Sequence, residues 1–597
     1  MGIKLESKLG TLSDIGKFIK PGDFVAIGGM WSSNKPMAAV REIIRQRIGG
    51  LKVTSILGGW EMEWLLAAGA VDHLMFSFLS LEFFGLPPNF RRVAENKLIK
   101  LTEIEGCSMI KGLEAGRLGL PFAQFHGPKG SDIVKESPHL YKTVICPFTG
   151  AELMAIQAIV PDVAIIHAQR ADAQGNVQIF GTSASDVDMA MAARRTIVTV
   201  EEIVSDEQIR AEKSATRLMR TDVDLVIHVP NGASPCSSIP YYAPHLLQMM
   251  KDVKGLQGKE AAQYIEATIG ASEAEYWENV GGEAARRKLA ALASRSGRID
   301  WPEEIGTRKA EQFDSADQMV VSLARTIDDR DSIVLGSFTP LAYAAYNLAK
   351  LTHAPNSFVL AYAGADALPF EMGFHTSEAA ALSNAAGLLS ATEGIEALHF
   401  RGRGDVEAVS SAQMDANGDI NISWLPTQVR DKDGKPTGEI NPRGLRLPGG
   451  AGAPVVYGRH RKSVAYFPSH STLVFVPKVN YVTGTRFYLG DEERRQVGLK
   501  PGPVLVVTNL CVMEMVARGK WVVRSLHKGA TAKDVIDNTG FAVEIAVDCP
   551  ETEAPTVQEV DLIKRIDPQG IRHLEFISGK ERAIKLPAIL QAEWNTV

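Results

Sequence analysis

The sequence predicts an α/β protein made of two related open α/β domains, joined in one chain with a pseudo-twofold relation between them. Three observations predict this fold class: apolar runs that alternate with glycine-rich turns and helical segments, a weak internal repeat, and a length of 597 residues, which suits two large domains. Short buried strands that alternate with helices are typical of largely parallel sheets.

The predicted strands end at glycines. Apolar runs at residues 24–27, 53–57 and 333–335 are each followed by one or two glycines. Residues 36–45 have the spacing of a helix, and Pro36 suits its first turn. The first strand is therefore expected to lead through a loop into the N-terminus of a helix.

The internal repeat supports two related halves. The segment DFVAIG at residues 23–28 has a counterpart in DSIVLG at residues 331–336, and AQRADAQGNVQI at residues 168–179 is echoed by AQMDANGDINI at residues 412–422. The second segment starts 145 positions after the first in one half and 81 in the other, so the first half carries about 65 extra residues in between.

The boundary between the halves is expected in a helical connector. Residues 273–304 are rich in Ala, Glu, Arg and Lys and contain no strand-like run. We therefore predict a first domain at residues 1–290, a linker at 291–310 and a second domain at 311–597.

The charged and apolar composition limits the kinds of partner that the protein is expected to bind. Lys and Arg total 64 against 70 Asp and Glu, so the net charge of −6 gives no reason to expect nucleic acid or an anionic membrane as a partner. No unbroken apolar segment suits a membrane helix, and the N-terminus lacks the apolar core of a secretory signal. We expect a cytoplasmic protein.

Sequence motifs limit the classes of enzyme to which the protein is expected to belong. Five widely spaced cysteines form no C-x-x-C pair, and no histidines cluster at zinc spacing, so neither a disulfide framework nor a metal site is expected. G-x-S-x-G, Walker A, H-E-x-x-H and G-x-G-x-x-G motifs are absent from the sequence. These absences argue against serine hydrolases, NTPases, metalloproteases and dehydrogenases.

Five segments in order resemble class I CoA transferases of the glutaconate CoA-transferase branch, with α-like and β-like subunits fused. They are residues 28–41, 161–176, 199–204, 352–356 and 447–453. The resemblance covers nearly the whole chain. It implies two open α/β domains that bind an acyl-CoA thioester at their interface, with coenzyme A as part of the substrate and no permanently bound cofactor. Association into a homo-oligomer is compatible with the pseudo-twofold halves.

Two glycine segments are candidate binding sites for the coenzyme. Backbone N–H groups left unshielded by glycine suit a thioester oxyanion or a phosphate, although the same residues also make ordinary turns. The candidates are Gly28, Gly29, Gly449, Gly450, Gly452 and Ala453.

Tyr362 stands where the resemblance implies the family's nucleophile. Class I CoA transferases use a glutamate of the β-like half that carries CoA as a glutamyl thioester. It follows a Thr-His-Ala-Pro-Asn-like turn and one strand, and the corresponding residues 352–364 read THAPNSFVLAYAG. A phenol with a pKa of about 10 cannot form the mixed anhydride of that route. This favours another reaction over CoA transfer.

A branch with the same loss is the heterodimeric steroid ring-cleaving hydrolases, which add water across a C–C bond of a cyclic β-diketone-like CoA ester. The resemblance implies a catalytic glutamate of the first half ahead of a Leu-Pro-Phe, here residues 120–122, and the candidates are Glu103 and Glu105. As a general base, such a glutamate takes a proton from water while the leaving carbanion is stabilised as an enolate. Alternatively, both carboxylates flank or cap the following helix.

Two alternative functions remain open because of other polar residues in the sequence. A carboxylate displaced along the loop after Tyr362 would restore a CoA transferase that exchanges CoA between an acyl-CoA and a carboxylate, and a CoA-binding protein without catalysis is the third reading. The remaining candidate substrate residues are Arg117, His126, Asp366, Glu371 and His375.

Overall fold

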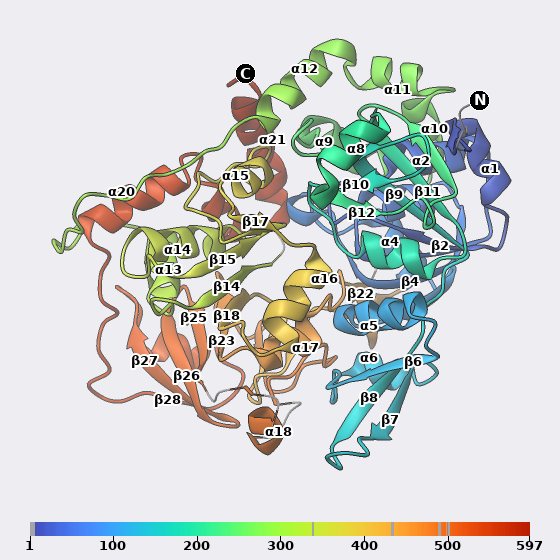
Figure 1. Cartoon of the computed structure of the whole chain (residues 1–597). Coiled ribbons are helices and arrows are strands. Elements are labelled where there is room, and N and C mark those ends of the chain that lie inside the picture. The colour runs from blue at the N-terminus through green and yellow to red at the C-terminus, as the bar shows by residue number, and fades with distance from the viewer. Residues whose placement is uncertain (1–5, 337–338, 432–434, 488–490, 497, 500–501) are drawn as a thin grey trace.

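The computed structural model describes the chain except residues 1–5, 337–338, 432–434, 488–490, 497 and 500–501. Figure 1 shows two α/β bodies side by side, one formed by the blue to green first half and one by the yellow to red second half. One large cluster of buried apolar side chains contains residues of both halves, so the two bodies pack directly against each other.

The first half is built on a ten-stranded sheet whose main path is parallel. Its order is β1-β13-β11-β9-β2-β3-β4-β5, and β10 and β12 pair off this path. The strands are β1 (Leu9–Gly10), β2 (Phe24–Ile27), β3 (Leu51–Gly58), β4 (Val71–Leu79), β5 (Lys100–Glu103), β9 (Val163–Ala171), β10 (Val177–Gln178), β11 (Thr196–Ile203), β12 (Thr216–Leu218) and β13 (Leu225–His228). The helices are α1 (Ile15–Phe18), α2 (Met37–Arg45), α3 (Trp60–Ala67), α4 (Pro88–Glu95), α5 (Gly106–Arg117), α7 (Asp186–Ala192) and α8 (Asp206–Ala211).

The second half is built on another ten-stranded sheet, with parallel strands at its centre. Its order is β17-β16-β15-β14-β18-β23-β25-β26-β27-β28. The strands are β14 (Ser332–Leu335), β15 (Phe358–Ala361), β16 (Gly364–Ala365), β17 (Gly387–Leu388), β18 (Val406–Val409), β23 (Lys462–Phe467), β25 (Val504–Thr508), β26 (Cys511–Ala517), β27 (Lys520–Leu526) and β28 (Val543–Glu544). The helices are α13 (Ser315–Ala324), α14 (Pro340–Leu351), α15 (Ser377–Ser383), α16 (Ala391–Gly394), α17 (Ala453–Arg459), α18 (Asp491–Gln496), α19 (Ala532–Asp537), α20 (Val557–Ile566) and α21 (Gly579–Trp594).

Smaller sheets extend both halves. The first half adds a sheet of β6 (Phe122–Phe125), β8 (Glu152–Gln157) and β7 (Tyr141–Ile145), with α6 (Asp132–Glu136) between β6 and β7. The second half adds the hairpin of β21 (Trp424–Arg430) and β22 (Pro436–Arg446), and a sheet of β20 (Ile420–Asn421), β19 (Gln413–Asp415) and β24 (Phe475–Val476). The first of these sheets lies in the predicted insertion of the first half.

The repeat found in the sequence has a structural counterpart. β2 and β14, which begin the repeated segments, both lie inside their sheets and pair with parallel neighbours on either side. In the second repeated segment, Asp172 accepts hydrogen bonds from the backbone N–H groups of Gln174 and Asn176, and Asp415 accepts one from Asn417. These features confirm the predicted fold class of two related α/β domains.

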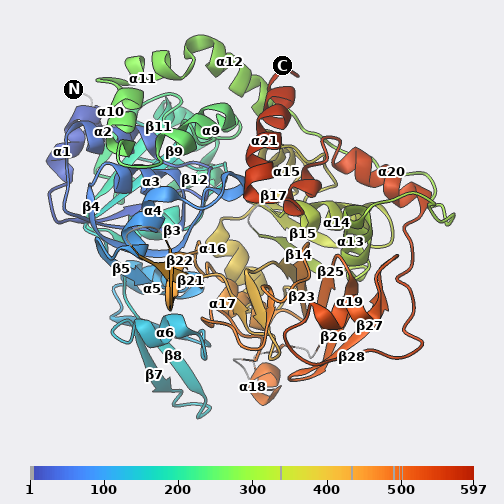
Figure 2. The ribbon, with the colours of Figure 1, turned by 180° about the vertical axis from the view of Figure 1, so that it is seen from behind.

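Helices connect the halves. After β13 come α9 (Leu246–Gly255), α10 (Ala261–Ile269), α11 (Glu273–Val280) and α12 (Gly282–Ala293), so the predicted connector is helical as far as Ala293. The C-terminal helix α21 returns to the first half and contacts α9 (Figure 2). Its Trp594 stacks on His245 with ring centroids 5.4 Å apart. The domain limits at residues 290 and 311 stay a prediction. In the described part of the chain, no helix is both long enough and apolar enough to cross a membrane.

Candidate functional site

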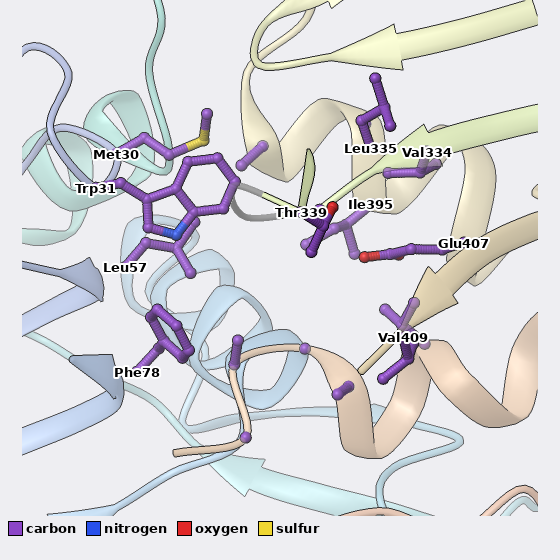
Figure 3. A pocket seen from close by; sticks show the side chains of 18 of the residues that line it. Met30, Trp31, Leu57, Phe78, Val334, Leu335, Thr339, Ile395, Glu407 and Val409 are labelled. Atoms are coloured by element: carbon purple, nitrogen blue, oxygen red, sulfur yellow. The ribbon is translucent and has the colours of Figure 1, made fainter. Parts of the chain in front are cut away.

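A cavity of about 400 Å³ lies between the two halves. Figure 3 shows side chains of the first half facing side chains of the second half across it. The first half contributes Met30, Trp31, Leu57, Phe78, Ser80 and Glu82. The second half contributes several apolar side chains, the polar residues Thr339, Tyr362, His399, Glu407 and Ser410, and residues 448 and 450–453 of one loop. Most of these positions lie at or beyond the carboxyl ends of parallel strands, the usual place for a ligand in open α/β sheets.

Several residues that line this cavity have a strained backbone. Four residues that line it have positive φ although they are not glycine: Trp31 at 51°, Glu82 at 53°, Tyr362 at 53° and Ala451 at 46°. Such conformations cost energy in residues with a Cβ and persist where the surrounding structure enforces them, as at many active sites. The strain therefore marks the cavity as the candidate site.

Tyr362 is held rigidly in the cavity wall, directly after β15. Its ring makes edge contacts with Trp31 of the first half and with Tyr343, at centroid distances of 6.4 and 6.2 Å. Burial raises the pKa of the Tyr362 phenol well above its usual value, and the nearby charges of Glu82 and Glu378 act in the same direction. The phenol is therefore a proton donor at neutral pH.

Glu82 brings a carboxylate to the same region from the first half. It follows β4 and accepts a hydrogen bond from the Ser32 hydroxyl at 3.1 Å. Burial raises the pKa of Glu82 to about 7, which the hydrogen bond from Ser32 only partly offsets. A carboxylate with this pKa exchanges protons efficiently near neutral pH.

Glu407 is a second carboxylate of the cavity. It belongs to β18 in the centre of the second sheet, and Figure 3 shows its side chain pointing into the cavity. The side chain is 18% exposed and lies 3.8 Å from His399 Nε2 and 4.0 Å from His460 Nε2. Burial raises the pKa of Glu407 to about 8. A Cβ on Gly336 would lie 2.8 Å from its carboxylate, so glycine at that position leaves room for it.

The glycine loop of the second half reaches the cavity. Gly450, Gly452 and Ala453 line it, whereas Gly449, at a φ of 109°, lies against the first half, where a Cβ would meet Ser77 O at 2.8 Å. Hydrogen bonds fix the loop on the first half: Ala451 N–H donates to Ser77 O, and Gly106 N–H donates to Ala451 O. The loop therefore joins the two halves beside the cavity.

Gly28 and Gly29 are not among the cavity-lining residues. The N–H of Gly28 donates to Ile165 O, and that of Gly29 donates to the buried carboxylate of Asp186 at 2.8 Å. These two N–H groups close the turn after β2, which is the structural alternative that the sequence left open.

Glu103 and Glu105 also lie outside the lining of the cavity. Glu103 forms a buried ion pair with Arg446 at 2.7 Å and accepts a hydrogen bond from the Ser423 hydroxyl. Glu105 caps α5, because its carboxylate accepts hydrogen bonds from the backbone N–H groups of Cys107 and Ser108. Burial raises the pKa of Glu105 to about 7.

The remaining candidates are dispersed. Arg117 pairs with Asp188 at 2.7 Å, and Asp366, half exposed, pairs with Lys350 at 3.3 Å. Glu371 is exposed, His126 is half-buried, and His375 is fully buried, with Nδ1 3.1 Å from Glu593. None of these five candidates lines the cavity.

Sequence reasoning missed Glu82, Glu407 and His399. A signal for Glu407 exists, since a lone glutamate between Val406 and Ala408 in a short apolar run, which forms β18, is costly unless it serves a site. For Glu82 the signal is its position three residues after an apolar strand. His399 carries no comparable sequence signal.

The chain matches the family model described as Coenzyme A transferase at residues 13–223 and 316–538, which is more than half of its length. Both subunits of the 3-oxoadipate CoA-transferase of Pseudomonas knackmussii are similar to it. The first is 35% identical over 229 residues, covering 38% of this chain and 80% of its own length. The second is 30% identical over 258 residues, covering 43% of this chain and 94% of its own length.

Other proteins similar to this chain have names that describe a different activity or none. The cholesterol ring-cleaving hydrolase IpdA subunit of Rhodococcus jostii is 30% identical over 234 residues, 37% of this chain and 78% of its own length. An uncharacterized protein of Archaeoglobus fulgidus is 34% identical over 282 residues, and the match spans 46% of this chain and 62% of that protein. The solved structure of an acyl-CoA transferase from Escherichia coli O157:H7 covers 92% of this chain and 96% of its own, with a TM-score of 0.63 and 13% identity, which is a likeness of fold.

Proposed function

Because this chain belongs to the coenzyme A transferase family and joins counterparts of both subunits, we propose that it hydrolyses a C–C bond of an acyl-CoA thioester by acid–base chemistry in the cavity between its halves. The observation that carries the proposal is Tyr362, a half-buried phenol in the cavity wall where the family resemblance implies the nucleophilic glutamate. A protonated phenol does not form a glutamyl-type thioester, but it donates a hydrogen bond to a developing oxyanion or enolate.

Glu82 is the proposed general base. It takes a proton from water, and the resulting hydroxide adds to a ring ketone of the acyl group. The C–C bond then breaks, its electron pair forms an enolate stabilised by the neighbouring carbonyl and the Tyr362 hydroxyl, and the proton on Glu82 is delivered to carbon. The product is a single ring-opened thioester that carries the new carboxyl group, which releases its proton to solvent. The raised pKa of Glu82 supports this role, because the same group must accept and release a proton near neutral pH.

Glu103 and Glu105 are proposed to support the site rather than to act on water. Glu105 caps α5, and the first residue of that helix, Gly106, hydrogen-bonds to the glycine loop. Glu103 holds Arg446, which lies at the start of the segment leading into that loop. Gly450, Gly452 and Ala453 are the proposed contacts for the thioester, because they line the cavity.

The walls of the cavity suit an apolar acyl group. Met30, Trp31, Leu57 and Phe78 face Leu335 and Ile395 across it. Apolar walls with few polar groups are typical of small-molecule sites, and here the polar groups are concentrated in a few side chains. The similarity to one chain of a cholesterol ring-cleaving hydrolase supports hydrolysis of a cyclic or β-keto acyl chain. A cytoplasmic location and assembly into a homo-oligomer stay predictions.

Turnover in ¹⁸O-labelled water tests the proposal. A panel of cyclic and β-keto acyl-CoA thioesters is screened by product mass, and hydrolysis predicts one ¹⁸O atom in the new carboxylate with the thioester intact. Glu82→Gln is expected to lower kcat at least about 100-fold, and Tyr362→Phe at least about tenfold. Glu303→Gln is the matched control, because Glu303 is exposed in the connecting segment. Unlabelled products, or a Glu82→Gln enzyme with full activity, would contradict the mechanism.

CoA transfer through a displaced carboxylate is the second candidate, and Glu82 itself favours it. A carboxylate that lines the cavity is positioned to attack a thioester when it is ionised. This mechanism requires a covalent CoA adduct on Glu82 and a second carboxylate as CoA acceptor. Exchange of labelled CoA between an acyl-CoA and free carboxylates, without net hydrolysis, would support it over C–C cleavage.

A further inference from the structure

We propose that His399, Glu407 and His460 form a binding site for a divalent transition-metal ion of the Zn²⁺ class in the wall of the cavity. One nitrogen or oxygen atom of each side chain lies within 4.8 Å of those of the other two. The Glu407 carboxylate is 3.8 Å from His399 Nε2 and 4.0 Å from His460 Nε2. The site goes beyond the proposed function, which uses none of these three residues.

Three different elements of the second half bring these side chains together. His399 lies in a π-helical turn at Ile395–Phe400, Glu407 lies on β18, and His460 follows α17. π-Helical turns are rare and frequent at functional sites. Here the turn places both Ile395 and His399 in the cavity lining, so the site opens towards the cavity.

The ligand chemistry suits zinc. Two imidazoles and one carboxylate are a common set for catalytic zinc, which has three protein ligands and keeps a further position open. Bond lengths of about 2.0–2.2 Å in a tetrahedral site require ligand atoms about 3.4 Å apart. The observed separations of 3.8 and 4.0 Å are therefore a few tenths of an ångström too wide. All three ligand atoms lie within 4.8 Å of one another, so coordination requires the Glu407 carboxylate and the two imidazole rings to move closer together by side-chain rotation.

The three side chains have few competing partners. His399 and His460 are buried, and their rings hydrogen-bond to each other through Nδ1 of His399 and Nε2 of His460 at 2.9 Å. Among the described residues, no side chain or backbone group donates a hydrogen bond to the Glu407 carboxylate within normal distance. A carboxylate that is mostly buried and accepts no hydrogen bond is costly unless a ligand satisfies it. A metal ion would replace the hydrogen bond between the two rings with coordination bonds.

Two arginines near the site are engaged by the backbone. Arg459 donates to the carbonyl oxygens of His399 and Phe400, and Arg494 donates to those of Gly458 and His460. These hydrogen bonds fix the backbone that carries both histidines. The positive charge of the arginines weakens cation binding, which makes the single carboxylate of the site decisive for affinity.

Metal binding to the full chain in the absence of substrate tests this inference. The chain is stripped with EDTA and titrated with Zn²⁺ in a calorimeter, and bound metal is counted by mass spectrometry after dialysis. We expect one equivalent per chain. Glu407→Gln and His460→Gln are expected to weaken binding at least about 100-fold, since losing a group that only supports a metal ligand already costs about 10–100-fold. His139→Ala is the matched control for surface histidines, because His139 is exposed, and it is expected to bind like the parent chain.

Co²⁺ binding is measured on the unmodified chain, so this test does not require any variant to fold. In the unmodified chain, Co²⁺ is expected to give d–d absorption bands of a four- or five-coordinate site, which Zn²⁺ displaces. No saturable equivalent of Zn²⁺ in the unmodified chain, or equal binding by Glu407→Gln and the parent chain, would overturn the inference. Because no substrate is present, failure of the proposed hydrolase reaction leaves this result unaffected.

Discussion

Replacing Glu103 with alanine is expected to destabilise the fold by about 3–5 kcal/mol, the usual cost of removing one partner from a buried ion pair. The Arg446 side chain is 2% exposed and that of Glu103 is 7% exposed, and their charged atoms are 2.7 Å apart. Without Glu103, the guanidinium would keep its contacts with the rings of Phe76, Phe90 and Trp424, at 5.0, 5.5 and 5.0 Å. Since Nε and Nη2 of Arg446 find no hydrogen-bond partner within the described part of the chain, the loss is expected at the upper end of this range.

Urea unfolding followed by tryptophan fluorescence measures this loss as a shift of the midpoint at constant slope. The double variant Glu103→Ala/Arg446→Met is the control. It removes the unpaired charge and leaves an apolar side chain among the three rings, so it should recover most of the lost stability. A loss below about 1 kcal/mol in the single variant, or a double variant no more stable than the single one, would refute the structural role of the pair.

Three further predictions concern the cap of α5, the base and the cavity. Glu105→Ala removes the N-cap of α5 and should lower stability by about 1–2 kcal/mol in thermal unfolding, and an unchanged melting temperature would argue against the cap. With a pKa of about 7, Glu82 is protonated at lower pH, so kcat/KM should rise with pH through about 7 and then level off. A Glu82→Gln enzyme that keeps this rise would assign it to another group. Trp31→Ala removes a wall of the cavity and should weaken transition-state binding of an apolar acyl-CoA by about 1.5–3 kcal/mol, or roughly 10–150-fold in kcat/KM. An equal effect on a short acetyl-type substrate would show that Trp31 acts through the fold and not through the acyl group.

The parts of the fold that local sequence determines were predictable. The strands at β2 and β14 follow from apolar runs that end at glycine, and the turns after Asp172 and Asp415 repeat one side-chain to backbone hydrogen-bond pattern in both halves. The match to the family model confirms the resemblance carried by five short segments.

The site was less predictable, because its carboxylates come from distant parts of the chain. Glu82 and Glu407 face one cavity only after the two sheets pack, and a single sequence does not reveal this arrangement. The candidates Glu103 and Glu105 were close in sequence to the implied motif, but their carboxylates are engaged by Arg446 and by the backbone of α5. Whether a carboxylate serves catalysis or the fold depends on what approaches it in three dimensions.

Trapping tests whether Glu82 acts as a base on water, with Tyr362 as the hydrogen-bond donor to the enolate, without covalent capture of CoA. The chain is incubated with an acyl-CoA that it turns over, treated with borohydride or hydroxylamine, and digested for peptide mass spectrometry. Unmodified peptides are expected for both residues while product accumulates. Reduction of Glu82 to the alcohol, or its conversion to the hydroxamate, would reveal a glutamyl thioester and contradict the account.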